Sequence, residues 1–267
     1  MRARRQQALS RLARFLARER GDVDVILPFG EVVDALGYRG ERELGLQVIE
    51  LDSIVGTVDR TTGFDRQFRP TTSRVRTRWE RIAAAMRRGE PMPPISVYRV
   101  GDAHFVRDGH HRVSVARALG LGTIEAHVTL VRTEVAPDGA LHIHDLPTKS
   151  YERLFLERVP LDPNARERIR LTDAYDYARL AEGVEAWGFR LVQDRAERLD
   201  RHEVARLWFA REYLPVVDML REAGMLGPGT EADAYVRVAN ERYRLLRTHE
   251  WSDEVLARLR EAGVGRD

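Results

Sequence analysis

The chain has 267 residues, with 44 basic and 42 acidic side chains, eight histidines and no cysteine. This length predicts one large domain or two modest ones. The absence of cysteine excludes disulfide bonds, thiolate metal sites and cysteine nucleophiles. No apolar run approaches the ~18–20 residues that span a bilayer, and residues 1–20 lack the apolar stretch of a secretory signal. We therefore expect a cytoplasmic protein with no membrane partner.

The basic side chains are almost all arginine, because Lys149 is the single lysine. The chain also lacks a glycine-rich Gly-Lys-Ser/Thr run, which excludes a phosphate-loop nucleotide site. Any anion site must therefore use arginine, histidine, backbone amides or a metal ion. Residues 1–90 contain 18 basic and 13 acidic side chains, whereas residues 91–267 contain 26 and 29. This difference is compatible with DNA, with nucleotide or with neither.

Residues 1–45 are predicted to form an N-terminal helical arm. Within it, residues 2–20 carry leucines at helical spacing and seven arginines, which indicates an amphipathic helix. This helix either docks on the domain or contacts nucleic acid or a membrane surface. A second short helix is expected over Glu31–Leu36, ended by Gly37.

Residues 46–131 show an α+β pattern that predicts a small mixed sheet with helices. The elements expected in chain order are a strand over Gln47–Leu51, a helix over Arg74–Arg88, a strand pair over Ile95–Val100 and Ala103–Arg107 joined by Gly101-Asp102, a helix over His111–Leu119 and a strand over Thr123–Val131.

Residues 132–149 are expected to be a linker, because proline, aspartate and glycine gather there. Residues 150–267 are expected to form an all-α C-terminal domain, with helices over Asp173–Trp187, His202–Ala223, Glu231–Arg247 and Asp253–Ala262. Thr230 with Asp233, and Ser252, provide the capping signals. The aromatic residues of this part are assigned to its core: Trp187, Phe189, Trp208, Phe209 and Tyr213.

The segment most informative about chemistry is Asp108-Gly109-His110-His111-Arg112, which follows a predicted strand and opens a predicted helix. Backbone amides and the positive end of a helix dipole face outward at such a turn, so it favours an anion. Arginine can clamp phosphate oxygens through two parallel hydrogen bonds, and histidine can donate hydrogen bonds or move protons near neutral pH. An aspartate here can bind magnesium, act as a base or simply cap the helix.

This segment resembles the ParB/sulfiredoxin superfamily. The corresponding turn reads Gly-Glu-Arg-Arg in partition proteins, Gly-Gly-Cys-His-Arg in sulfiredoxin and Asp-Gly-His-Thr-Arg in free-serine kinases. The flanking segments at residues 48–54 and 92–98 look like the family's opening strand and the strand before the motif. The resemblance covers about residues 46–131. The helical remainder resembles an extension of uncharacterised bacterial proteins that have this domain.

The resemblance implies a nucleotide-triphosphate pocket with Arg112 on the phosphates and Gly109 beneath them. Sulfiredoxin chemistry is excluded, because His110 stands where that reaction needs cysteine. The partition branch uses CTP as a DNA-clamp switch and carries a helix-turn-helix, which this sequence does not show convincingly. The kinase branch matches Asp-Gly-His and departs at His111, which replaces threonine. Its second catalytic acid has only Asp59 and Asp65 as candidates.

Two further groups of residues are weighed as sites. Arg60, Arg66 and Arg69 lie in the segment that in relatives folds over the nucleotide, where they either contact phosphate or DNA or form an exposed loop. His142 and His144 have the alternating spacing of a paired-histidine metal site, but they lack a third ligand and are more often an ordinary strand.

We therefore expect a protein that binds ATP or CTP with Mg²⁺ and hydrolyses it or transfers a phosphoryl group to a small molecule. The alternative is a DNA-binding regulator or partition protein in which the nucleotide is a switch. A third hypothesis is a degenerate domain that only scaffolds partners through its helical half. A homodimer is a further expected partner. The catalytic candidates are Asp108, which also holds the metal, His110 and His111. The nucleotide-binding candidates are Gly109, Arg112, Ser114, Arg60 and Arg66.

Overall fold

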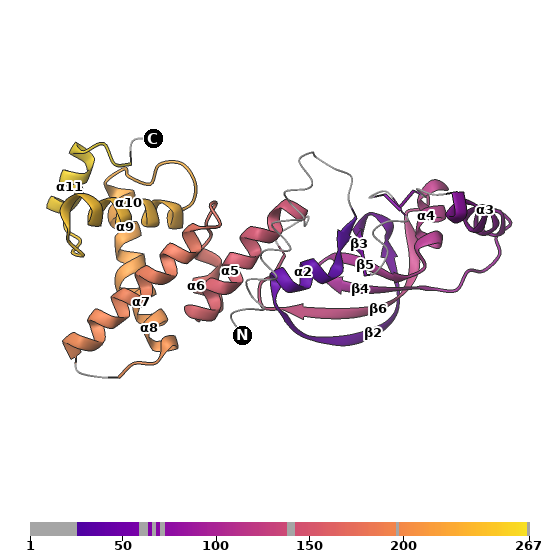
Figure 1. Ribbon diagram of the computed structural model, residues 1–267, viewed down its shortest axis with the longest axis horizontal. Coiled ribbons are helices and arrows are strands. Elements are labelled where there is room, and N and C mark those ends of the chain that lie inside the picture. The colour runs from indigo at the N-terminus through magenta and orange to yellow at the C-terminus, as the bar shows by residue number, and fades with distance from the viewer. Residues whose placement is uncertain are drawn as a thin grey trace. The chain divides into compact units, whose positions relative to one another are not determined.

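The computed structural model describes residues 26–58, 64–65, 68–69, 73–137, 142–195 and 198–265, without the side chains of residues 73–76 and 194–195. The chain divides into two compact units between Ser150 and Tyr151. The first contains a six-stranded sheet and the second is helical (Figure 1). The expected fold class, a small mixed sheet with helices followed by an all-α part, is therefore confirmed. Among the described residues, no helix is long and apolar enough to cross a membrane.

The sheet has the strand order β1-β3-β5-β4-β6-β2. Its elements in chain order are β1 (Leu27–Pro28), α2 (Phe29–Leu36), β2 (Tyr38–Glu50), β3 (Ile54–Thr57), α3 (Ser73–Arg87), β4 (Ile95–Val100), β5 (Ala103–Asp108), α4 (His110–Ala118) and β6 (Thr123–Thr133). β3 pairs in parallel with both β1 and β5, and β4 pairs in parallel with β6. The β4–β5 and β2–β6 pairs are antiparallel.

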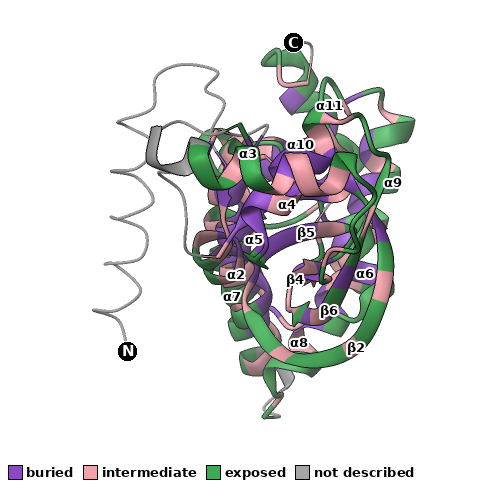
Figure 2. Ribbon diagram, turned by 90° about the vertical axis from the view of Figure 1, so that its right-hand side faces the viewer, coloured by how far each residue is buried: buried purple, intermediate pink, exposed green. Residues whose placement is uncertain are grey.

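The core of this unit forms where alternating apolar residues of the sheet meet one face of α4. Every second residue of a strand points to the same face, and Ala126 and Val128 of β6 are buried as that period predicts. Other members of the same cluster are Ile49, Ile54, Ile95, Val97, Val106, Val113 and Ala116. β2 lies at the sheet edge and is exposed along most of its length (Figure 2).

The first unit differs from the sequence prediction at its beginning and end. Residues 1–45 were expected to be a helical arm, yet in their described part β1 and the first half of β2 belong to the sheet. The predicted helix over residues 2–20 lies outside the described residues. The strand expected over Gln47–Leu51 is the second half of a 13-residue strand whose alternation is weak, because most of its side chains are exposed on both faces.

The expected linker over residues 132–149 is only partly irregular. β6 runs on to Thr133, and α5 (Leu146–Arg158) begins before the linker was expected to end. Pro147 is one of the prolines of the expected linker, but it stands in the first turn of α5. A proline is tolerated there, because the first N–H groups of a helix have no partner within the helix.

The helical unit continues with α6 (Pro163–Arg168), α7 (Asp176–Arg195), α8 (Arg201–Trp208), a π-helical segment (Phe209–Tyr213), α9 (Leu214–Glu222), α10 (Glu231–Leu246) and α11 (Asp253–Glu261). The predicted helix over His202–Ala223 is thus continuous. Pro215 lacks an N–H, and its ring crowds the helical turn before it. The wider π-helical segment, Phe209–Tyr213, lies in that preceding part of the helix.

The expected helix caps of this unit are confirmed. Thr230 and Asp233 form a reciprocal capping box at the start of α10, and the Ser252 side chain accepts from the Val255 N–H at the start of α11. Trp208 and Tyr213 are fully buried, as predicted for core aromatics. The assignment of Phe189 to the core was wrong, because this residue lies on the solvent side of α7 and is 64% exposed.

Candidate functional site

The turn between β5 and α4 carries the motif. β5 ends at Asp108, Gly109 adopts a left-handed conformation with φ 104°, and α4 begins at His110. A Cβ at position 109 would lie 2.4 Å from the Ile95 Cγ2 atom, so both the conformation and the close packing require glycine. The N-cap residue of α4 is Gly109 itself, which has no side chain to accept from the first helical N–H groups. The turn therefore has the backbone geometry of an anion site.

His110 and His111 point into the protein from the first turn of α4. Their exposed fractions are 4% and 8%. The Nε2 atom of His110 lies 2.6 Å from the Thr57 hydroxyl of β3, and its ring stacks against Phe64 and Phe68 at centroid distances of 5.9 and 6.3 Å. His111 meets the Phe64 ring edge-on at 5.3 Å. The two imidazoles thus form a buried aromatic cluster at the base of the turn.

Arg112 is also held from within the fold. Its Nη1 atom donates to the Pro93 carbonyl and, at 2.7 Å, to the Pro94 carbonyl, and its Nη2 atom donates to the Asp108 carboxylate at 2.6 Å. The Arg112 side chain is 13% exposed and that of Asp108 is 74% exposed. These three bonds leave two of the five guanidinium N–H donors for another acceptor. Asp108 presents its carboxylate at the surface.

Ser114 is placed on the face of α4 that packs against α3. Its hydroxyl accepts a 2.8 Å hydrogen bond from the Trp79 indole N–H, and only 4% of the residue is exposed. The motif residues Asp108, Gly109, His110, His111, Arg112 and Ser114 therefore lie on one turn and the helix that follows it. Within this set, Asp108 is the exposed side chain and the two histidines and Ser114 are buried.

The loop candidates are only partly described. Arg60, Arg66 and Asp59 lie outside the described residues. Arg69 donates from its backbone N–H and from Nε to the Asp65 carboxylate, at 2.8 and 2.7 Å. Asp65 is thereby engaged by Arg69 in its own turn.

The paired histidines His142 and His144 lie in a short turn instead of a strand, with their rings stacked at 5.2 Å. The Nε2 atom of His144 is 3.4 Å from the Asp145 carboxylate. Within the described ranges, no three His, Asp or Glu side chains form a group that could hold a metal ion.

Two further residues of the first unit are not among the candidates taken from the sequence. Arg117, in the last turn of α4, donates to the Leu51 and Ile54 carbonyls at 2.8 and 2.7 Å, and its guanidinium lies 5.1 Å above the Phe68 ring. Burial lowers the pKa of Arg117, and Asp52 and Asp65 act in the opposite direction. A cation in the last turn of a helix is the signal that could have identified it.

His104 of β5 is the second such residue. Its Nδ1 atom lies 2.8 Å from the Ser53 hydroxyl, and only 7% of the residue is exposed. Burial, with a smaller contribution from Arg99, lowers the pKa of His104 to about 4, against the influence of Asp102. His104 is therefore neutral over the physiological range. It fixes the start of β3 to the start of β5, four residues before the strand end that carries the motif.

Comparison with known proteins gives partial likenesses. No protein-family model and no curated protein matches this chain. Sulfiredoxin from Arabidopsis thaliana is 20% identical, over 31% of this chain and 82% of its own length, with a TM-score of 0.25. A conserved hypothetical protein from Pyrococcus furiosus is 18% identical over 33% of each chain, with a TM-score of 0.24. A Pnob8-like ParB-N domain is 10% identical over 84% of each chain, with a TM-score of 0.22.

At TM-scores below 0.5 these likenesses carry no argument about family, activity or ligand. Those are inferred from the residues alone.

Proposed function

We propose that the β5–α4 turn binds the phosphates of ATP or CTP, with Mg²⁺, and that the protein hydrolyses the nucleotide or transfers its terminal phosphoryl group to a small molecule. The observation that carries the proposal is the start of α4. Gly109 turns the chain directly from a strand into a helix and, as its N-cap residue, offers no side-chain acceptor to the first helical N–H groups. The turn lies between an exposed carboxylate and a fixed guanidinium. A helix start of this kind favours an anion through its amides and its dipole.

In this proposal, Arg112 neutralises phosphate charge with the two N–H donors that do not bond to Pro93, Pro94 or Asp108. Because its other donors are fixed by carbonyls, the guanidinium is already oriented and loses little side-chain entropy on binding. His110 and His111 would support the turn from beneath and donate toward charge that develops on the transferred group. Gly109 lets the backbone approach the phosphates closely.

The reaction proposed is an in-line displacement. The oxygen of water or of an acceptor hydroxyl bonds to the terminal phosphorus as the bond to the bridging oxygen breaks. Asp108 accepts the proton of the attacking group, and the nucleoside diphosphate leaves with the bonding electron pair. Asp108 is the motif residue whose carboxylate is exposed enough to reach an attacking group.

The residues fit a magnesium site of the kind that a nucleotide completes. Mg²⁺ in such sites takes one or two protein carboxylates and otherwise phosphate oxygens and waters. Asp108, whose Oδ2 accepts from Arg112, is the motif carboxylate that could enter such a site, and it would then be the metal ligand instead of the base. The bound ion would neutralise charge on the phosphates.

The test is calorimetric titration of the full chain with ATP and with CTP in the presence of Mg²⁺, together with a turnover assay. We expect Arg112→Ala to weaken nucleotide binding by about tenfold or more, and Asp108→Asn to reduce turnover more than binding. Arg107→Gln is the matched control, because Arg107 is exposed and adjacent in sequence, with its guanidinium 5.8 Å from the Tyr98 ring. A folded wild-type protein that neither binds nor turns over either nucleotide would overturn the proposal.

One observation favours the alternative of DNA binding. The side chains of Arg78, Arg81 and Arg87 on α3 are exposed. Exposed arginines on one helix suit contact with a phosphate backbone, and such binding weakens steeply as salt rises. A duplex-DNA titration at two salt concentrations, with and without nucleotide, distinguishes this function. Salt-dependent binding that Arg78→Gln with Arg81→Gln abolishes would support it, and no binding at low salt would remove it.

A further inference from the structure

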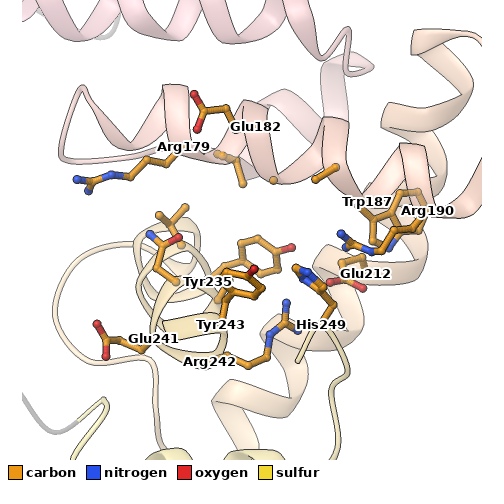
Figure 3. Close-up of a pocket in the computed structure, with 16 residues that line it drawn as sticks. Arg179, Glu182, Trp187, Arg190, Glu212, Tyr235, Glu241, Arg242, Tyr243 and His249 are labelled. Carbon is orange, nitrogen blue, oxygen red and sulfur yellow. The ribbon is translucent and has the colours of Figure 1, made fainter. Parts of the chain in front are cut away.

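The helical unit contains a cavity of about 730 Å³ that is independent of the nucleotide site proposed above. α7 and α10 provide most of its walls, the π-helical segment contributes Glu212, and the chain after α10 contributes His249 (Figure 3). Cavities of ~300–1,000 Å³ are the size in which proteins bind small organic molecules. This cavity is therefore large enough for a ligand of one or two rings.

The middle of the cavity is apolar and aromatic. Tyr235 and Tyr243 of α10 lie at its centre, and Trp187 of α7 lies toward one end (Figure 3). Leu180, Ala186, Val236 and Ala239 also line it. Aromatic side chains prefer offset-stacked or edge-to-face contacts with other rings. The walls thus suit a flat, apolar ligand body.

The end near Trp187 is charged. Arg190, Glu212, Arg242 and His249 gather there (Figure 3). Glu212 accepts a 2.8 Å hydrogen bond from the Trp251 indole N–H. At this end two guanidinium groups face one carboxylate, which leaves a surplus of one positive charge. Burial, Arg190 and Arg242 together lower the pKa of His249, so that imidazole adds no charge at neutral pH.

Arg242 is the residue that most clearly lacks a ligand. Only 4% of it is exposed, yet its buried Nε atom has no hydrogen-bond partner in the described part of the chain. Its guanidinium lies 3.8 Å from the Trp251 ring centroid, and its hydrogen bond to the Glu250 carbonyl is long at 3.4 Å. Burial lowers the pKa of Arg242. A buried guanidinium with so few acceptors is costly unless an anion completes it.

Arg190 also has a guanidinium that an anion could complete. It lines the same end of the cavity, and none of the described residues forms an ion pair or hydrogen bond with its guanidinium. By contrast, Arg179 is paired with Asp176, and Glu241 is paired with Arg244. Glu182, the remaining charged residue of the lining, lies away from this end (Figure 3). The surplus of positive charge at this end therefore comes from Arg190 and Arg242.

The backbone beside the cavity is also irregular where Glu212 enters it. The continuous helix from Arg201 to Glu222 is π-helical between Phe209 and Tyr213. An extra residue in a helical turn rotates the following side chains, and such segments often occur at functional sites. Here it brings Glu212 to the charged end of the cavity.

We propose that this cavity binds an aromatic carboxylate: a flat ring system that packs against Tyr235 and Trp187, with one carboxylate between Arg190 and Arg242. A guanidinium matches a carboxylate through two parallel hydrogen bonds. A single negative charge balances the surplus of one. A phosphate dianion would exceed that surplus and meet the Glu212 carboxylate at the same end.

The test is isothermal titration of the full chain with sodium 2-naphthoate, with the neutral 2-naphthamide and with inorganic phosphate. We expect 2-naphthoate to bind, 2-naphthamide to bind at least about tenfold more weakly, and inorganic phosphate not to compete. Arg190→Gln should weaken naphthoate binding by about tenfold, and it should fold because Arg190 is only half-buried. Arg206→Gln removes the same charge from the exposed face of α8 and should bind as the wild type does.

Three results would overturn the proposal. These are no binding of 2-naphthoate at millimolar concentration, equal binding of the amide and the acid, and unchanged naphthoate binding by Arg190→Gln. Arg242→Gln provides a second measurement. If it folds, it should lose naphthoate binding, and if it does not fold, the Arg190 variant still decides.

Discussion

The Asp108 carboxylate and the Arg112 guanidinium form a 2.6 Å ion pair across the glycine turn, although Asp108 is largely exposed and Arg112 is nearly buried. This asymmetry assigns different roles to two residues of one motif. Arg112 joins the start of α4 to the carbonyls of Pro93 and Pro94 in the segment before β4, whereas Asp108 contributes little to the core. The ion pair links the structural part of the motif to its exposed part.

The first prediction separates these roles by stability. Arg112→Ala removes the donors of two carbonyls and one carboxylate, so it should lower the free energy of unfolding by about 2–3 kcal/mol. Asp108→Asn keeps an acceptor for Arg112 and acts at the surface, so it should cost less than about 1 kcal/mol. Urea unfolding monitored by circular dichroism measures both. Equal effects of the two substitutions would contradict the distinction.

The second prediction concerns Gly109. Gly109→Ala places a Cβ 2.4 Å from Ile95 Cγ2 at a backbone conformation that alanine rarely adopts. We expect a loss of about 2–4 kcal/mol in the free energy of unfolding. Gly30→Ala is the control, because a Cβ at position 30 of α2 meets nothing within 4 Å. It should leave stability unchanged or raise it slightly.

Most elements of the sheet unit could be predicted from local pattern. The α4 start, the Gly101-Asp102 turn and the alternation of β6 are determined by residues close together in sequence. The length of β2 could not be predicted, because an edge strand with two exposed faces has no hydrophobic alternation. The start of α5 was also not predicted, because a proline such as Pro147 disrupts the interior of a helix but is tolerated in its first turn.

The motif was found from sequence, but its internal contacts were not. The turn predicted an anion site, and the residue types indicated which groups could act. Those contacts join residues that are 18 to 53 positions apart in the sequence. Arg112 donates to Pro93 and Pro94, and His110 meets Thr57. The cavity of the helical unit had no sequence signal either, because Trp187, Arg190 and Arg242 come together only when α7 packs against α10.

The third prediction concerns Ser114, which the sequence suggested as a nucleotide ligand. Its hydroxyl accepts from the Trp79 indole N–H and is buried between α3 and α4. Ser114→Ala leaves that N–H without its acceptor, so it should lower the free energy of unfolding by about 1–2 kcal/mol and alter tryptophan fluorescence. If Ser114 acts only through packing, nucleotide affinity should stay within about twofold of the wild type. A larger loss of affinity in the folded variant would assign it to the ligand instead.

The last prediction is a pH dependence of stability carried by His104. Its pKa is about 4 in the folded protein and ~6.5 when unfolded, so between these values the unfolded chain binds more protons. The stabilisation is therefore complete above pH 6.5 and is lost as the pH falls toward 4, by on the order of 2 kcal/mol. Urea unfolding at pH 7 and pH 4.5 measures the difference in wild type and in His104→Gln. The variant should lose much of this pH dependence, whereas His144→Gln, which removes a histidine 75% exposed, should retain it. A His104→Gln profile parallel to that of the wild type would show that the buried imidazole is not the group that titrates.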